Sequence, residues 1–220
     1  PPGESCSPVL LCHFEALPIF NSVTASSVTS TPATILELVS GHFSNGVGTR
    51  DGFAREFAYD NISSGGSMVT GGLTVEYWLA KTGGSGALDG AHLWDNQVIV
   101  NLSSGSFIAF SIGNILQGPG LDFSGFSIDT PSTTFNLEPY VLTDGSFRAI
   151  AISISGSTAR VFANGTLLFT QDISPLDLTG DTITRVYFAY APYGVVVDEL
   201  RVSPCAIYMA SYTPSAVEFT

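Results

Sequence analysis

The feature that most constrains the fold is a ribbon of alternating residues that two turn signals interrupt. In SFRAIAISISGSTARVFANGTLLF, residues 146–169, isoleucines alternate with small residues between positions 149 and 154. This period of two is that of a β-strand. Gly156 ends this first strand, and Asn164-Gly165 supplies the two positive-φ residues of a type I′ turn. The segment therefore predicts an antiparallel meander of three strands.

Similar short runs recur along the chain, separated by clusters of Gly, Ser, Asn and Asp. They are VLLCHFEA (9–16), LTVEYWLAK (73–81), QVIVNL (97–102), SFIAFSIG (106–113), FSGFSIDT (123–130), RVYFAYA (185–191) and GVVVDELRV (194–202). No segment of ten or more residues has a convincing helical period. Two antiparallel sheets packed face to face are the simplest way to bury so many strands. We expect one domain over residues 1–220, because no linker or shift in composition divides the chain.

The composition excludes several classes of partner. The formal net charge is -12, and Lys81 is the only lysine among seven basic residues, so no cationic patch is available to neutralise phosphates. Nucleic acid is therefore not an expected partner. No run approaches the roughly 18 apolar residues that span a bilayer, so we expect no membrane span. The apolar residues must instead form a core and contacts with other subunits.

Three segments carry a resemblance to a known family. LTVEYWLAK, then SFRAIAISISGSTARVFANGTLLF, then VVVDELRVSPCAIYMASYTP occur in the order found in laminin-G-like domains of the concanavalin A-like lectin/glucanase superfamily. The opening SPVLLCHFEA resembles the first strand of such domains in phage and other virion proteins. The sequence departs from the pattern at Cys12, where an aliphatic residue is usual, and in SFRAIAI, where an aromatic-His pair is common. The resemblance covers nearly the whole chain and implies an all-β jelly-roll sandwich of two antiparallel sheets.

The resemblance also implies a disulfide. In the resembled fold the first and last strands lie side by side and run antiparallel. Aligning VLLCHF with VVVDELRV near their midpoints places Cys6 opposite Cys205, so we predict a bond that staples the two ends of the chain. Such a bond is typical of an oxidising compartment. Cys12, in the middle of the first strand, is then expected to be a buried small apolar residue.

The acidic residues do not indicate catalysis. A retaining glycosidase needs two carboxyl groups about 5 Å apart, which favours acids two residues apart on one face of a strand. No two acids have this spacing, and the three histidines have no metal-ligand or nucleophile-elbow spacing. The adjacent Asp198 and Glu199 would point to opposite faces of a regular strand. We interpret them as structural, with one meeting solvent and the other finding Arg201 or a backbone donor. We predict no catalytic residues.

The segment LDGAHLWDNQ, residues 88–97, is the richest candidate for a ligand-binding loop. Its polar side chains could hydrogen-bond sugar hydroxyls, its Trp offers a flat apolar face, and YAPYG (190–194) adds a second aromatic face. The predicted ligand-binding residues are Asp89, His92, Trp94, Asp95, Asn96 and Tyr193. We expect no cofactor, although calcium could also use the same oxygens. The alternative is a polar loop whose aromatic residues only pack against the edge of the sandwich.

Members of the resembled superfamily are mostly glycan-binding or protein-binding modules, with some glycoside hydrolases, in extracellular and viral assemblies. This resemblance implies a non-enzymatic structural or adhesive module of an extracellular or virion surface that binds glycans. The low share of charged residues, 12% of the chain, suggests faces and sheet edges covered by copies of the chain or by other surface proteins. The competing expectation is a polysaccharide hydrolase or lyase whose acids converge only in three dimensions.

Overall fold

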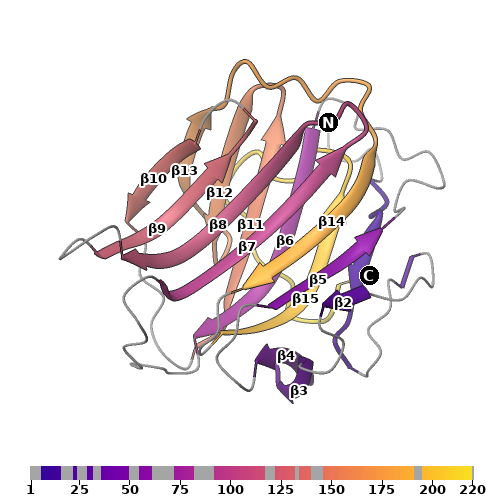
Figure 1. Cartoon of the computed structure of the whole chain (residues 1–220), viewed down its shortest axis with the longest axis vertical. Helices are drawn as coiled ribbons and strands as arrows, with labels where there is room; N and C mark the ends of the chain where they lie inside the picture. The colour runs from indigo at the N-terminus through magenta and orange to yellow at the C-terminus, as the bar shows by residue number, and fades with distance from the viewer. Residues whose placement is uncertain are drawn as a thin grey trace.

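The computed structural model describes residues 6–15, 22–23, 29–31, 36–49, 55–60, 72–81, 92–116, 122–131, 134–139, 146–190 and 195–219. Within these ranges the regular structure consists of β-strands, without a helix. No helix in this part of the chain is therefore available to cross a membrane. The strands form two antiparallel sheets that pack face to face (Figure 1). The prediction of an all-β, concanavalin A-like jelly-roll sandwich is confirmed.

The first sheet has eight strands in the order β13-β12-β11-β6-β15-β4-β3, with β1 also paired to β15. Strand β15 pairs with β6 along one edge and with both β4 and β1 along the other. The strands of this sheet are β1 (Leu10–Cys12), β3 (Leu36–Ser40), β4 (Asn45–Thr49), β6 (Gly72–Lys81), β11 (Arg148–Ser155), β12 (Thr158–Ala163), β13 (Thr166–Asp172) and β15 (Val195–Ser203).

The second sheet has seven strands in the order β10-β9-β8-β7-β14-β5-β2, and it faces the viewer in Figure 1. Its strands are β2 (Thr29–Thr31), β5 (Arg55–Asp60), β7 (His92–Leu102), β8 (Phe107–Leu116), β9 (Asp122–Asp129), β10 (Thr134–Pro139) and β14 (Ile183–Tyr190). Because β13 belongs to the first sheet and β14 to the second, the segment 173–182 crosses from one layer to the other.

The predicted meander forms β11, β12 and β13. β11 pairs antiparallel with β12, and β12 with β13. Asn164 and Gly165, at the turn between β12 and β13, have positive φ angles of 48° and 75°, as the sequence predicts. The side-chain Oδ1 of Asn164 accepts a hydrogen bond of 3.0 Å from the backbone N–H of Ala149, which ties the turn to β11.

The main core lies between the sheets. Alternate residues of the central strands are fully buried there, such as Ile152 on β11, Val75 on β6 and Val98 on β7. Phe14, just after β1, is also completely buried in this cluster. Burial of such apolar side chains is the main source of stability for a sandwich of this kind. Cys12 lies in the same core, so its prediction as a buried apolar residue is confirmed.

A second apolar cluster lies on the outer face of the eight-stranded sheet. Leu11, Trp78 and Ala149 belong to it, while the next residue along each strand, such as Leu79 or Ile150, belongs to the main core. Phe219 completes the cluster, because residues 204–219, here called the C-terminal strap, run across this face after β15. The strap explains why six consecutive residues of β11 are buried rather than every second one. The sequence pattern did not predict this cover.

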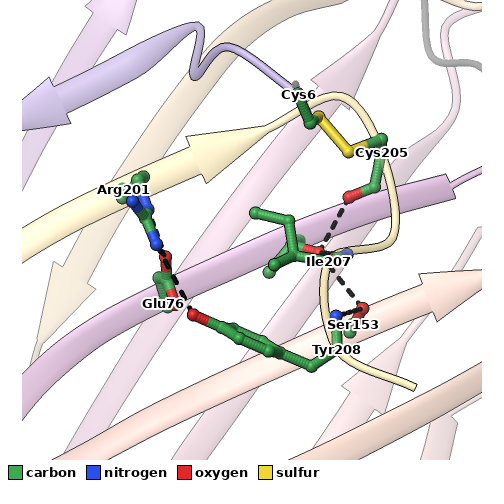
Figure 2. Close-up of a disulfide and its surroundings, with 8 residues drawn as sticks. Cys6, Glu76, Ser153, Arg201, Cys205, Ile207 and Tyr208 are labelled. Carbon is green, nitrogen blue, oxygen red and sulfur yellow. Dashed lines mark hydrogen bonds and ion pairs between the residues drawn. A yellow bond between two sulfur atoms is a disulfide. The ribbon is translucent and has the colours of Figure 1, made fainter. Parts of the chain in front are cut away.

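The strap is fastened to the sheet by polar contacts near its start (Figure 2). The hydroxyl of Thr74 donates to the carbonyl oxygen of Cys205 over 2.8 Å and accepts from the backbone N–H of Ile207 over 2.9 Å. The hydroxyl of Ser153 accepts from the backbone N–H of Tyr208 over 3.2 Å. These buried hydroxyls therefore serve as anchors for backbone groups that regular pairing would leave unsatisfied.

Further along, the strap is held by aromatic packing and by the meander turn. Tyr208 and Tyr212 stack with ring centroids 3.7 Å apart, and Tyr212 meets Phe162 edge to face at 5.5 Å. The backbone N–H of Tyr212 donates to the carbonyl oxygen of Gly165 over 2.8 Å. The strap thus contacts β6, β11, β12 and the β12–β13 turn.

The predicted disulfide between Cys6 and Cys205 is present (Figure 2). Strands β1 and β15 pair antiparallel with Leu10 opposite Val202, as the resemblance implies. Beyond this ladder the two cysteines lie with their Cα atoms 6.3 Å apart, which is within the range of a disulfide. The bond therefore joins the segment before β1 to the start of the strap.

Candidate functional site

The predicted ligand-binding loop is partly a strand. Residues 92–97 form the beginning of β7, so the expectation of a loop over 88–97 is wrong for this half. The pairing of Asp95 with Gly113 and of Asn96 with Ile112 shows that this end of β7 is still part of the sheet. Asp89 and Tyr193 lie outside the described residues.

The pairing of β7 with β8 is irregular at the start of β7. A register irregularity lies between His92 and Trp94. Ligand binding by the residues predicted in this segment stays a prediction.

An open cleft of about 490 Å³ lies at one end of the sandwich. Its walls come from the β7–β8 turn, from Pro131, two residues after the end of β9, and from the crossing segment 173–182. The polar lining residues are Ser104, Ser106, Asp177, Thr179 and Asp181, and the apolar ones are Pro131, Pro175 and Leu176. The sequence did not predict this cleft, because the sequence of each segment that forms a wall is that of an ordinary turn containing Ser, Pro or Gly.

Asp181 holds two walls of the cleft together. Its carboxylate accepts hydrogen bonds from the backbone N–H of Ser104 over 2.8 Å, from the Ser104 hydroxyl over 2.9 Å and from the Ser103 hydroxyl over 3.1 Å. Ser103 and Thr182 exchange two further bonds of 2.9 and 3.0 Å. Three donors on one carboxylate make this junction between the β7–β8 turn and the crossing segment well ordered.

Asp177 faces the cleft as an exposed carboxylate. Its Oδ1 accepts a hydrogen bond of 2.8 Å from the backbone N–H of Thr179, and this bond is the first cause that lowers the pKa of Asp177. Asp177 is therefore ionised at neutral pH. Among the described residues, those that line the cleft include two acids and no Lys, Arg or His, so this part of the lining is negatively charged.

The second group of interest is the adjacent acid pair on β15. The register shifts between Asp198 and Leu200, and Glu199 has a positive φ of 50°. Val197 and Leu200 both face the core, so the two acids between them both project to the outer side. The prediction that they occupy opposite faces is wrong, because a β-bulge at Glu199 breaks the alternation.

Asp198 is fully buried beneath the turn before β4. Its Oδ2 accepts hydrogen bonds from the backbone N–H groups of His42, over 2.7 Å, and Phe43, over 3.0 Å. Burial raises the pKa of Asp198, and these hydrogen bonds oppose the rise. The His42 ring stacks on Trp78 with centroids 3.8 Å apart. Asp198 thus fixes this turn against the sheet.

Glu199 is also fully buried, and it holds the end of the strap. Its two oxygens lie 2.9 and 3.0 Å from Nδ1 of His13, and Oε2 accepts from the backbone N–H of Phe219 over 2.9 Å. Burial raises its pKa more than these contacts lower it. The expectation that one acid of the pair meets solvent is therefore wrong, whereas the expected backbone donors are found.

His13, Glu199 and Glu218 bring three potential metal-ligand atoms within 4.8 Å of one another. Both oxygens of Glu199 already contact His13, and one also accepts from the strap backbone. A cation at this point would have to share or replace these bonds. The contacts present are those of a structural fastening between β1, β15 and the strap.

Arg201 does not pair with the acids beside it in sequence. It forms an ion pair with Glu76 on the neighbouring strand β6, and the hydroxyl of Tyr208, from the strap, points toward the pair (Figure 2). Burial and the nearby Glu76 raise the pKa of the Tyr208 hydroxyl, so this phenol is neutral. The guanidinium also lies 4.5 Å from the centroid of the Phe219 ring. Glu76, Arg201 and Tyr208 thus form a polar network beneath the strap.

Comparison with known proteins gives structural likenesses only. No protein-family model matches the chain, and no curated protein sequence matches it. Domain 4 of a GH43 extracellular arabinanase from Geobacillus stearothermophilus, solved in complex with arabinotriose, is similar over 92% of this chain and 95% of that one, with a TM-score of 0.62 and 13% identity.

Two other similar structures are larger. The botulinum neurotoxin serotype G binding domain is similar over 92% of this chain, with a TM-score of 0.54 and 9% identity, and the chain covers 49% of it. Trypanosoma rangeli sialidase is similar over 90% of this chain, with a TM-score of 0.57 and 10% identity, and the chain covers 30% of it. The chain thus spans half or less of these two proteins, and the likenesses show a shared β-sandwich fold.

Proposed function

We propose that this chain is a non-enzymatic carbohydrate-binding module with an adhesive or structural role on an extracellular surface. The observation that carries the proposal is the nearly end-to-end likeness to an arabinanase domain that was solved with arabinotriose. The likeness spans 95% of that domain, so the match covers the domain as a unit rather than a shared fragment. Fold likeness alone does not determine function, so the proposal also depends on the chemistry of the cleft.

The disulfide supports the extracellular setting. Cys6–Cys205 joins residues 199 positions apart, and structural disulfides of this kind persist in oxidising compartments. Within this proposal, the laminin-G-like character and a virion surface are the finer assignment that the strand motifs favour. Copies of the chain or other surface proteins are its proposed partners, and calcium is a proposed aid to binding.

The acids of the structure support a binding role over hydrolysis. A glycosidase acid needs a raised pKa and access to the substrate. Asp198 and Glu199 have raised pKa values, but both are fully buried and neither lines the cleft. Asp177 lines the cleft, but its pKa is lowered, and the carboxylate of Asp181 already accepts three hydrogen bonds. Among these described acids, the two whose pKa is raised do not line the cleft.

The proposal is tested by applying the purified chain to a broad glycan array, first with calcium and then with chelator. We expect selective binding to a subset of glycans. The absence of binding to any glycan under both conditions would contradict a carbohydrate-binding role and favour a purely structural one. Turnover of a polysaccharide that is abolished by changing a single carboxylate would instead establish the competing hydrolase or lyase.

A further inference from the structure

The open cleft at the end of the sandwich carries an inference that rests on the proposed function and specifies its ligand. We propose that this cleft is the glycan site and that it takes neutral oligosaccharides, with the carboxylate of Asp177 accepting hydrogen bonds from sugar hydroxyls. Three observations support the assignment: the form of the cleft, its chemical lining and its charge.

The form suits a small ligand. A volume of about 490 Å³ lies within the range of ordinary ligand sites, which is roughly 300 to 1,000 Å³. The walls are also pre-ordered, because Asp181 bonds to Ser103 and Ser104 across the junction of two chain segments. A site that is already ordered loses little freedom when a ligand binds.

The lining has the two surfaces that a sugar presents. Pro131, Pro175 and Leu176 offer apolar contacts for the C–H groups of a pyranose or furanose ring. Asp177 and the hydroxyl of Thr179 offer polar contacts at the same cleft. An ionised carboxylate can accept about four hydrogen bonds, and the backbone N–H and the hydroxyl of Thr179 occupy two of these positions on Asp177. Acceptor capacity therefore remains for sugar hydroxyls.

The charge selects among glycans. Within the described part of the chain, two acids and no Lys, Arg or His line the cleft, and the chain as a whole carries a net charge of -12. A uronate, a sulfated sugar or a sialylated glycan would bring a third negative charge to this cleft, which like-charge repulsion opposes. Recognition of carboxylate or sulfate groups ordinarily uses Arg. The lining thus favours glycans without ionised groups.

The experiment uses an array that contains neutral, sialylated, sulfated and uronate-containing glycans. Asp177→Ala is compared with Asp172→Ala, a matched control. Asp172 is also an exposed acid whose Oδ1 accepts from the backbone N–H two residues later, at Ser174, but it does not line the cleft. We expect neutral glycans to bind, with about tenfold weaker binding after Asp177→Ala and less than twofold change after Asp172→Ala.

A second variant tests the cleft without touching the acid. Ser106→Tyr places a large side chain in the lining, and we expect it to abolish binding while the thermal unfolding midpoint stays near that of the wild type. Selective binding of anionic glycans would overturn the inference. So would binding of neutral glycans that neither Asp177→Ala nor Ser106→Tyr weakens, although the proposed function would then survive. If the wild type binds no glycan on the array, the proposed function itself is overturned.

Discussion

The C-terminal strap can be tested at a single glycine. Gly165 and Gly156 both have positive φ angles, 75° and 55°, so an alanine at either position strains the backbone. They differ in their surroundings. A Cβ at Gly156 would meet nothing within 4 Å, whereas a Cβ at Gly165 would overlap the carbonyl oxygen of Tyr212 and lie 2.8 Å from Cδ of Pro214. Gly156→Ala is therefore the matched control for Gly165→Ala.

The expected magnitudes follow from these contacts. Gly156→Ala should cost about 1 kcal/mol, the strain of a positive φ less the entropy that alanine removes from the unfolded chain. Gly165→Ala should add the loss of the bond from Tyr212 N–H to the Gly165 carbonyl, about 1 kcal/mol. Weaker packing of Tyr212 on Tyr208 and Phe162 should add about 1 kcal/mol more. The total for Gly165→Ala is then about 3 kcal/mol.

Urea unfolding measures the free energy of unfolding of both variants, and thermal unfolding measures their midpoints; both are followed by tryptophan fluorescence and near-ultraviolet circular dichroism. At about 2–4 °C per kcal/mol for a chain of this length, Gly165→Ala should lower the thermal midpoint by about 6–12 °C and Gly156→Ala by about 2–4 °C. The near-ultraviolet signal of the strap tyrosines should change in the first variant only. Equal losses in the two variants would refute the claim that the strap is packed on the turn.

Three further predictions concern groups that hold the sandwich together. Replacing Cys6 and Cys205 with Ser should cost about 2–5 kcal/mol, because the bond closes a loop over 199 positions; reductant should destabilise the wild type in urea unfolding but leave the double variant unchanged. Glu76→Gln should cost about 3–5 kcal/mol because it leaves the Arg201 guanidinium without its buried partner; adding Arg201→Met should recover part of this loss, and no recovery would argue against the pairing. Burial raises the pKa of Asp198 above its value in the unfolded chain, so the stability that Asp198 contributes is fully present below about pH 4 and is lost as the pH rises through the folded pKa. Between about pH 4 and pH 8 the free energy of unfolding should therefore fall in the wild type relative to Asp198→Asn. Parallel pH profiles of the two proteins would contradict this.

The parts of the fold that the sequence predicts correctly are those with a local signal. Alternation over 149–154 predicts β11, and Asn164-Gly165 predicts the turn because few residue pairs adopt two positive φ angles. The Cys6–Cys205 bond was implied by the resemblance, which supplied the pairing of the first and last strands. In these cases a residue pattern or a recognised topology determines the structure directly.

The parts that it missed depend on contacts between distant segments. Nothing around Glu199 signals a bulge, since glutamate does not favour a positive φ, and the bulge is compensated by His13 and Phe219 from opposite ends of the chain. Residues 204–219 have neither a strand nor a helix period, so their packing could not be read from alternation. The cleft likewise forms where the β7–β8 turn meets the crossing segment, a junction that no local pattern encodes.

The strap also changes the argument for self-association. The low charge and apolar composition predicted faces covered by neighbouring subunits, yet one such face, around Trp78 and Ala149, is covered by the chain itself. Two exposed large apolar residues of the described part, Met209 and Val217, lie on the strap at 52% and 66% exposure. The strap surface and the sheet edges are therefore the surfaces available for association between copies of the chain. We expect an oligomer by light scattering at micromolar concentration, which Met209→Lys with Val217→Lys should dissociate. A wild-type monomer would contradict this expectation and mean that the strap alone covers the apolar surface that the composition predicts.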